Sequence, residues 1–113
     1  MSFTVRKDDA KGVVIIGVDG QLIVGNRHDL KKKVLDAVEV GDRKFVVDFS
    51  ATGYIDSSGL GALVLLAKKV REAGGDLRLA GLNDDLRTLF ELTKLDTLFT
   101  IVPTVEEAVS AFA

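Results

Sequence analysis

A strand that runs through a polar turn into a helix constrains this chain more than any other feature. The apolar residues of 45–49 are typical of a strand that is covered on both faces. The stretch from Tyr54 to Gly61 is polar and glycine-containing, and the run from Leu60 to Ala73 has apolar residues at helical spacing. A strand that leads through a short turn into an amphipathic helix is the unit from which α/β domains are built.

Similar apolar patterns flank this unit on both sides and predict the rest of the fold. The predicted order is β-β-α-β-α-β-α-β-α, with four amphipathic helices and a mixed central sheet. The fold class is therefore α/β. The strands are expected at residues 3–6, 13–18, 45–49, 76–79 and 99–102, and the helices at 29–40, 60–73, 84–93 and 105–112.

The lengths of the connections predict how the strands pair. The turn at residues 8–12 is short, so the first two strands are expected to form an antiparallel hairpin. The later strands are separated by helices, which favours parallel pairing through right-handed crossovers. The strand at residues 45–49 is the best candidate for the centre of the sheet.

Local signals mark where the helices begin and end. Asn26 or Asp29 is expected to cap the first helix, and Asn83 to cap the third. Thr104 and Glu107 match the capping box of a C-terminal helix. Gly41 is placed to end the first helix, because glycine adopts the left-handed conformation found after many helices.

Length and composition narrow the class of protein. The 113 residues suffice for one domain with its own core, so residues 1–113 are read as a single unit. A net charge of −2, from 15 basic and 17 acidic residues, favours neither nucleic acid nor an anionic membrane as a partner. The chain lacks cysteine, an apolar leader at its start and any apolar run of about 18–20 residues. We therefore expect a cytoplasmic protein.

The polar turn contains more candidate capping residues than the start of one helix requires. Asp and Ser are good N-cap residues, but one cap accounts for only one of Asp56, Ser57 and Ser58. Gly59 and Gly61 in the first turns of a helix each cost about 0.5–1 kcal/mol relative to alanine. Hydroxyls at a helix N-terminus suit a phosphate, because the first N–H groups are unpaired there. This pattern indicates a hydroxyl that is presented to a partner, with little bulk around it.

Several other chemistries are disfavoured by the same residues. A serine nucleophile needs a base, and the chain has one histidine, His28, in a position typical of a surface or capping residue. The turn does not match the Gly-x-Ser-x-Gly pattern of hydrolases, and no phosphate-binding glycine loop occurs. A lone histidine without cysteine makes a zinc site improbable. We predict no catalytic residue, no metal and no cofactor.

The turn resembles the signature of a known family. Asp56-Ser57-Ser58-Gly59-Leu60-Gly61, after a Val-Val-Asp-Phe strand, is similar to the motif of anti-sigma factor antagonists. These proteins form part of the STAS family of sulphate transporter and anti-sigma factor antagonist domains. Gly20-Gln21-Leu22 corresponds to the family's Gly-Glu-Leu turn, and Gly74-Gly75 with the following strand also fits, so the resemblance spans nearly the whole chain.

The resemblance implies a phosphorylation switch. In the family, the first serine after the aspartate is phosphorylated by a serine kinase of the histidine-kinase-like ATPase type, which is itself the anti-sigma factor. That serine is Ser57 here, with Ser58 as the alternate. The dephosphorylated antagonist binds the anti-sigma factor, the sigma factor is released to regulate transcription, and a serine phosphatase resets the cycle. The residues expected at the partner interface are Asp56, Ser57, Ser58, Gly59, Leu60, Gly61, Ile23, Val24 and Gly25.

The sequence departs from the family pattern at two positions. Many antagonists carry an aspartate near the phosphoserine at the position of Ile23, and many carry a glycine at the position of Lys94.

Two other functions are consistent with the sequence. One alternative is a STAS module of another signalling scaffold, or one that carries a small ligand or lipid. A lesser alternative is a small enzyme that uses Ser57 as its nucleophile.

Overall fold

The sheet is built around β2 (Val13–Leu22), which pairs with three other strands. β1 (Ser2–Asp8) is antiparallel to it, β3 (Lys44–Asp48) is parallel to it up to Gly17, and β4 (Thr52–Ile55) is parallel to it from Gly20 onward. The computed structural model describes residues 2–112, so Met1 and Ala113, the ends of the predicted domain, lie outside the described residues. The remaining elements are α1 (Arg27–Glu39), α2 (Ser57–Glu72), β5 (Asp76–Ala80), α3 (Asp84–Leu92), the 3-10 helix η1 (Leu95–Thr97), β6 (Ile101–Val102) and α4 (Val105–Ser110).

The predicted α/β class and mixed sheet are confirmed. The strand order is β1-β2-β3-β5-β6, so β3 lies at the centre, as its apolar sequence predicts. β1 and β2 form the antiparallel hairpin, and β3, β5 and β6 are parallel to β2. The helical connections between the parallel strands account for this arrangement.

The predicted order of elements is wrong at one place, because the polar turn begins with a strand. Thr52–Ile55 forms β4, which continues the pairing along β2 after β3 has ended at Asp48. The register shifts between Gly20 and Gln21. Buried Thr52 donates a hydrogen bond from its hydroxyl to the Val18 carbonyl oxygen, which fixes the start of β4 against β2.

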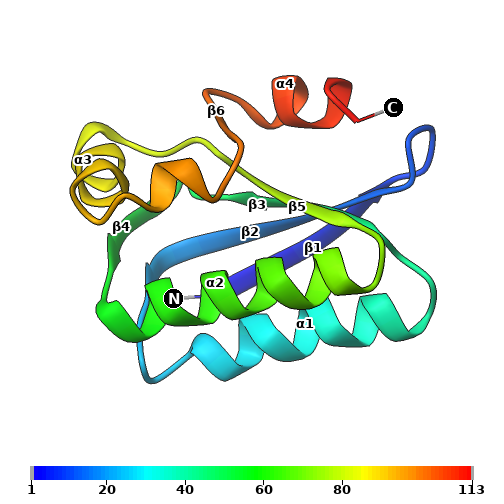
Figure 1. Ribbon diagram of the computed structural model, residues 1–113, viewed down its shortest axis with the longest axis horizontal. Coiled ribbons are helices and arrows are strands. Elements are labelled where there is room, and N and C mark those ends of the chain that lie inside the picture. The colour runs from blue at the N-terminus through cyan, green and yellow to red at the C-terminus, as the bar shows by residue number, and fades with distance from the viewer. Residues whose placement is uncertain (1, 113) are drawn as a thin grey trace.

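The helices divide the hydrophobic side chains into two clusters. α1 and α2 lie side by side on one face of the sheet, and α4 lies on the other face (Figure 1). The larger cluster joins the first face to α3, whose Phe90 ring meets Phe99 edge to face with 6.0 Å between centroids. The smaller cluster lies under α4 and comprises Val13, Ile15, Val46, Ala80, Ala108, Val109 and Phe112.

Most predicted helix ends are confirmed. Asn83 and Thr104 accept hydrogen bonds from the backbone N–H groups of Leu86 and Glu107. Gly41 has a φ of 104°, as expected of a glycine that ends a helix. Thr93, the last residue of the predicted third helix, lies just after α3 and is exposed, and its hydroxyl donates a hydrogen bond to the Leu89 carbonyl oxygen at 2.8 Å.

Candidate functional site

The predicted switch serine lies at the N-terminus of α2. Asp56 is the N-cap residue, and its Oδ1 accepts a hydrogen bond of 2.7 Å from the Gly59 N–H. Ser57 is the first helical residue and is exposed, whereas Ser58 is partly buried. The N–H groups of these two serines have no acceptor within the helix, because the first turn lacks a preceding one. This position therefore favours a negative group on Ser57.

The two glycines of the motif differ in their surroundings. Gly59 is buried, and a Cβ on it would lie 2.5 Å from the Leu22 carbonyl oxygen and 3.0 Å from Ile55 Cγ2. Gly61 is exposed, and a Cβ there would have no neighbour within 4 Å. The expectation that both glycines clear space for a partner is wrong for Gly59. Its missing side chain lets α2 rest directly on the end of β2.

The second predicted segment, the turn of residues 21–26, is held by a buried asparagine. Asn26 is 5% exposed, accepts a hydrogen bond from Ile23 N–H at 2.8 Å and donates one to the Gln21 carbonyl oxygen at 2.7 Å. Asn26 occupies the N-cap position of α1, but its side chain makes no capping hydrogen bond. Asp29 lies inside the first turn, so the predicted side-chain cap is wrong for both residues. Asn26 shapes the turn instead.

Asp56 joins the two segments. Its Oδ2 accepts a hydrogen bond of 3.1 Å from the Val24 N–H, and its own N–H donates to the Leu22 carbonyl oxygen at 3.1 Å. One carboxylate thus bonds the turn after β2 with one oxygen and the first turn of α2 with the other. The structure therefore brings together the two segments that the sequence predicts, although more than thirty residues separate them in the chain. Val24 and Gly25 are exposed, whereas Ile23 is partly buried.

A groove of about 520 Å³ begins at Ser57 and was not expected from the sequence. Tyr54, Ser57 and Leu60 line one side of it, and Asp85, Leu89 and Thr93 line the other. The second set belongs to α3 and the residue after it. Sequence pattern alone gives no signal for this juxtaposition, because it depends on where α3 lies beside β4.

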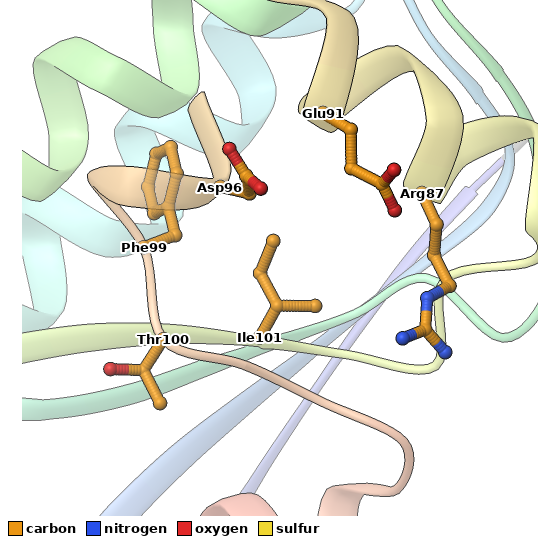
Figure 2. A pocket seen from close by; sticks show the side chains of 6 residues that line it. All are labelled: Arg87, Glu91, Asp96, Phe99, Thr100 and Ile101. Carbon is orange, nitrogen blue, oxygen red and sulfur yellow. The ribbon is translucent and has the colours of Figure 1, made fainter. Parts of the chain in front are cut away.

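Another hollow, of about 410 Å³, lies between α3 and the segment that leads into β6 (Figure 2). Arg87, Glu91 and Asp96 place charged groups around it, and Phe99, Thr100 and Ile101 complete its lining. The side chains of Arg87 and Glu91 both project from α3 toward this hollow. None of the residues that line it belongs to the predicted switch motif, so it does not extend the site at Ser57.

Two further observations bear on the chemistry of the chain. Within residues 2–112, no cluster of three or more histidine, cysteine, aspartate or glutamate side chains is arranged to hold a metal ion. No helix in the same range combines the length and apolar character needed to cross a membrane.

Comparison with known sequences gives a consistent family. The sequence profile of the STAS domain matches residues 4–108. A Bordetella bronchiseptica protein with the provisional name anti-sigma factor antagonist BtrV is 31% identical over 112 residues, which cover 99% of this chain and 95% of that protein. The anti-sigma-B factor antagonist of Bacillus subtilis is 28% identical over 101 residues, which cover 89% of this chain and 92% of the relative.

Solved structures agree with these relatives. A crystal structure of a Thermotoga maritima protein, also provisionally named an anti-sigma factor antagonist, superposes with a TM-score of 0.89 at 31% identity, covering 97% of this chain and 93% of that one. The phosphorylated form of the Bacillus protein SpoIIAA has the same fold, with a TM-score of 0.75, 21% identity and coverage of 96% and 97%. Since the profile spans almost the full length of the sequence, the chain belongs to the STAS domain family.

Proposed function

We propose that this protein is an anti-sigma factor antagonist whose binding is controlled by phosphorylation of Ser57. The observation that carries the proposal is the exposed Ser57 hydroxyl on a helix N-terminus fixed by Asp56 and Gly59. Relatives that carry the antagonist name match nearly the whole chain, which supports the same role here. Ser58 is the alternate acceptor, but its partial burial makes Ser57 the better one.

The proposed partners follow the cycle of the family. The dephosphorylated chain binds an anti-sigma factor that is also a serine kinase of the histidine-kinase-like ATPase type, and this frees a sigma factor. The kinase transfers the γ-phosphoryl group of ATP to Ser57 Oγ, the hydroxyl loses its proton, and ADP leaves. A serine phosphatase hydrolyses the phosphoserine and restores binding. In this proposal the chain acts in the cytoplasm as a single domain over residues 1–113, binds its partner and catalyses nothing itself.

Local charge explains how the phosphate would act. A phosphoserine carries a charge of about −1.5 to −2 at neutral pH and adds three acceptor oxygens. Within the domain this group is tolerated, because the helix N-terminus offers unpaired N–H groups and a positive dipole end. In a close-packed interface the same group would be desolvated and would crowd any facing carboxylate. Phosphorylation therefore blocks binding without any refolding of the chain.

The site assignment is tested by phosphorylation with the cognate kinase. The purified protein is incubated with the histidine-kinase-like ATPase and ATP, and the modified residue is mapped by mass spectrometry. We expect phosphate on Ser57, no incorporation in Ser57→Ala, and incorporation close to wild type in Ser58→Ala. Undiminished incorporation in Ser57→Ala would exclude Ser57 as the acceptor.

Binding calorimetry tests the consequence of the modification. Ser57→Asp places a permanent carboxylate at the switch position, so we expect weaker binding to the kinase than for wild type. A variant that bound as tightly as wild type would count against repulsion at the interface.

A further inference from the structure

The turn after β2 includes exposed residues but is held by hydrogen bonds from two sides. Asn26 holds it from the start of α1 through hydrogen bonds to Ile23 and Gln21, and Asp56 holds it from the start of α2 through the Val24 N–H. The Ile23 carbonyl oxygen also accepts hydrogen bonds from Asn26 and Arg27. A loop bonded from two helices loses little further conformational freedom on binding, and such preorganisation favours affinity.

This fixed turn presents an apolar side chain beside the switch serine. Val24 is 58% exposed, and its N–H lies 3.1 Å from the carboxylate of Asp56, the residue before Ser57. Tyr54 is similarly exposed, at 57%, and lines the same groove as Ser57. Tyr54 pairs with Gln21 in the parallel register of β4 and β2, so the sheet also fixes its backbone. Val24 is thus held beside the residue that precedes Ser57, and Tyr54 lines the groove that begins at Ser57.

We propose that Asp56 is a positioning residue for partner recognition, which holds Val24 so that Val24 and Tyr54 supply exposed apolar surface next to Ser57. The inference rests on the proposed function and names the surface by which the partner is chosen. The partner presents apolar side chains at this point, because residues 23–25 carry no charge and Val24 and Tyr54 supply the exposed contact area. Aromatic residues such as Tyr54 are enriched among the residues that dominate binding energy.

The two oxygens of Asp56 have separate tasks in this arrangement. Oδ1 caps α2 through Gly59, whereas Oδ2 serves only the Val24 N–H among the described hydrogen bonds. Asparagine is as good an N-cap as aspartate, so Asp56→Asn keeps an oxygen for Gly59. Its amide NH₂ then faces the Val24 N–H, and two donors cannot bond each other. This variant therefore releases the turn without removing the helix cap.

A double-mutant cycle tests the proposal with the unphosphorylated protein and the cognate histidine-kinase-like ATPase. We expect Val24→Ser to weaken binding about 5- to 30-fold, the range of a residue that matters in an interface. Val40→Ser is the matched control, because Val40 is 82% exposed but lies at the C-terminal end of α1, and we expect unchanged binding. Asp56→Asn is expected to weaken binding in the wild-type background and to have less than about a 2-fold effect in the Val24→Ser background.

Hydrogen exchange checks that Asp56→Asn releases the turn and leaves the helix cap in place, while the coupling in binding reports its role in recognition. Asp56→Asn should speed exchange of the Val24 amide while leaving the Leu60 amide, inside α2, as protected as in wild type. Binding of Val24→Ser as tight as wild type would overturn the proposal, as would effects of Asp56→Asn and Val24→Ser that multiply in full. If the wild-type chain fails to bind the kinase at all, the proposed function fails instead, so the two failures are distinguishable.

Discussion

Gly59 faces the carbonyl oxygen of Leu22 so closely that a Cβ on Gly59 would lie 2.5 Å from it. The Leu22 oxygen belongs to the backbone, and the position of a Cβ is fixed by the backbone of residue 59. Neither atom can move away by a change of side-chain rotamer. We expect Gly59→Ala to lower the free energy of unfolding by about 1–3 kcal/mol, as overpacking does in a close-packed site. Urea unfolding measures the change, and a variant as stable as wild type would contradict the contact.

Gly61→Ala gives the matched control on the same helix. No neighbour lies within 4 Å of a Cβ at this position, and alanine is a better helix residue than glycine. We expect this substitution to raise the free energy of unfolding by about 0.5–1 kcal/mol. A loss of stability for Gly59→Ala and a gain for Gly61→Ala would show that the fold requires a glycine at 59 and not at 61.

The start of β4 depends on one buried hydroxyl. Thr52 is 3% exposed, and its Oγ1 donates to the Val18 carbonyl oxygen. Thr52→Val keeps the shape of the side chain and removes the donor, so we expect a loss of about 1–3 kcal/mol in the free energy of unfolding. Thr52→Ser, which keeps the hydroxyl, should be less harmful. Thermal unfolding of both variants measures the losses, and a Thr52→Val variant as stable as wild type would contradict the role of the hydroxyl.

The side chain of Asn83 connects α3 to the segment before the switch helix. It accepts from the Leu86 N–H at 2.8 Å and donates to the Thr52 carbonyl oxygen at 3.3 Å. Asn83→Ala removes both bonds and should cost about 0.5–2 kcal/mol of stability. Asn83→Asp keeps the cap and loses the amide donor, so its cost should fall between wild type and Asn83→Ala. If Asn83→Asp were as unstable as Asn83→Ala, the helix cap would contribute nothing to stability, contrary to this prediction.

Phe112 anchors α4 to the sheet. Phe112 is buried, and the Arg78 guanidinium carbon lies 4.0 Å from the centroid of its ring. We expect Phe112→Ala to increase hydrogen exchange of the Ala108 and Val109 amides, because the smaller cluster loses its largest side chain. Phe112→Leu keeps apolar bulk and should retain more of the protection. Equal exchange in wild type and Phe112→Ala would show that α4 does not depend on this contact.

Much of the architecture could be predicted because local physics fixes it. The apolar residues of β3 place that strand at the centre of the sheet, and the helices between the later strands enforce parallel pairing. Asn83 and Thr104 cap helices as expected, since a cap depends only on a side chain and the next few residues. Among the three adjacent capping candidates Asp56, Ser57 and Ser58, the structure assigns the cap to Asp56.

The remaining features depend on contacts that a linear pattern does not contain. β4 is a strand because β2 extends beyond the end of β3 and needs another partner, which the four residues of β4 do not reveal. Asn26 bonds its own turn, where a capping role was expected, because Gln21 and Ile23 offer it both an acceptor and a donor. The burial of Gly59 and the groove beside Ser57 follow from how α2 meets β2 and how α3 lies against β4.

Because α4 packs on the face of the sheet opposite α2, a fluorophore on α4 can report partner binding at Ser57 from a distance. The chain has no cysteine, and Ser110 is an exposed residue of α4, on the face opposite α2. A Ser110→Cys variant therefore accepts one fluorophore at a unique thiol. The dye is attached on the smaller cluster's side of the sheet, so partner exchange at Ser57 can be followed by anisotropy while the recognition surface itself stays unlabelled.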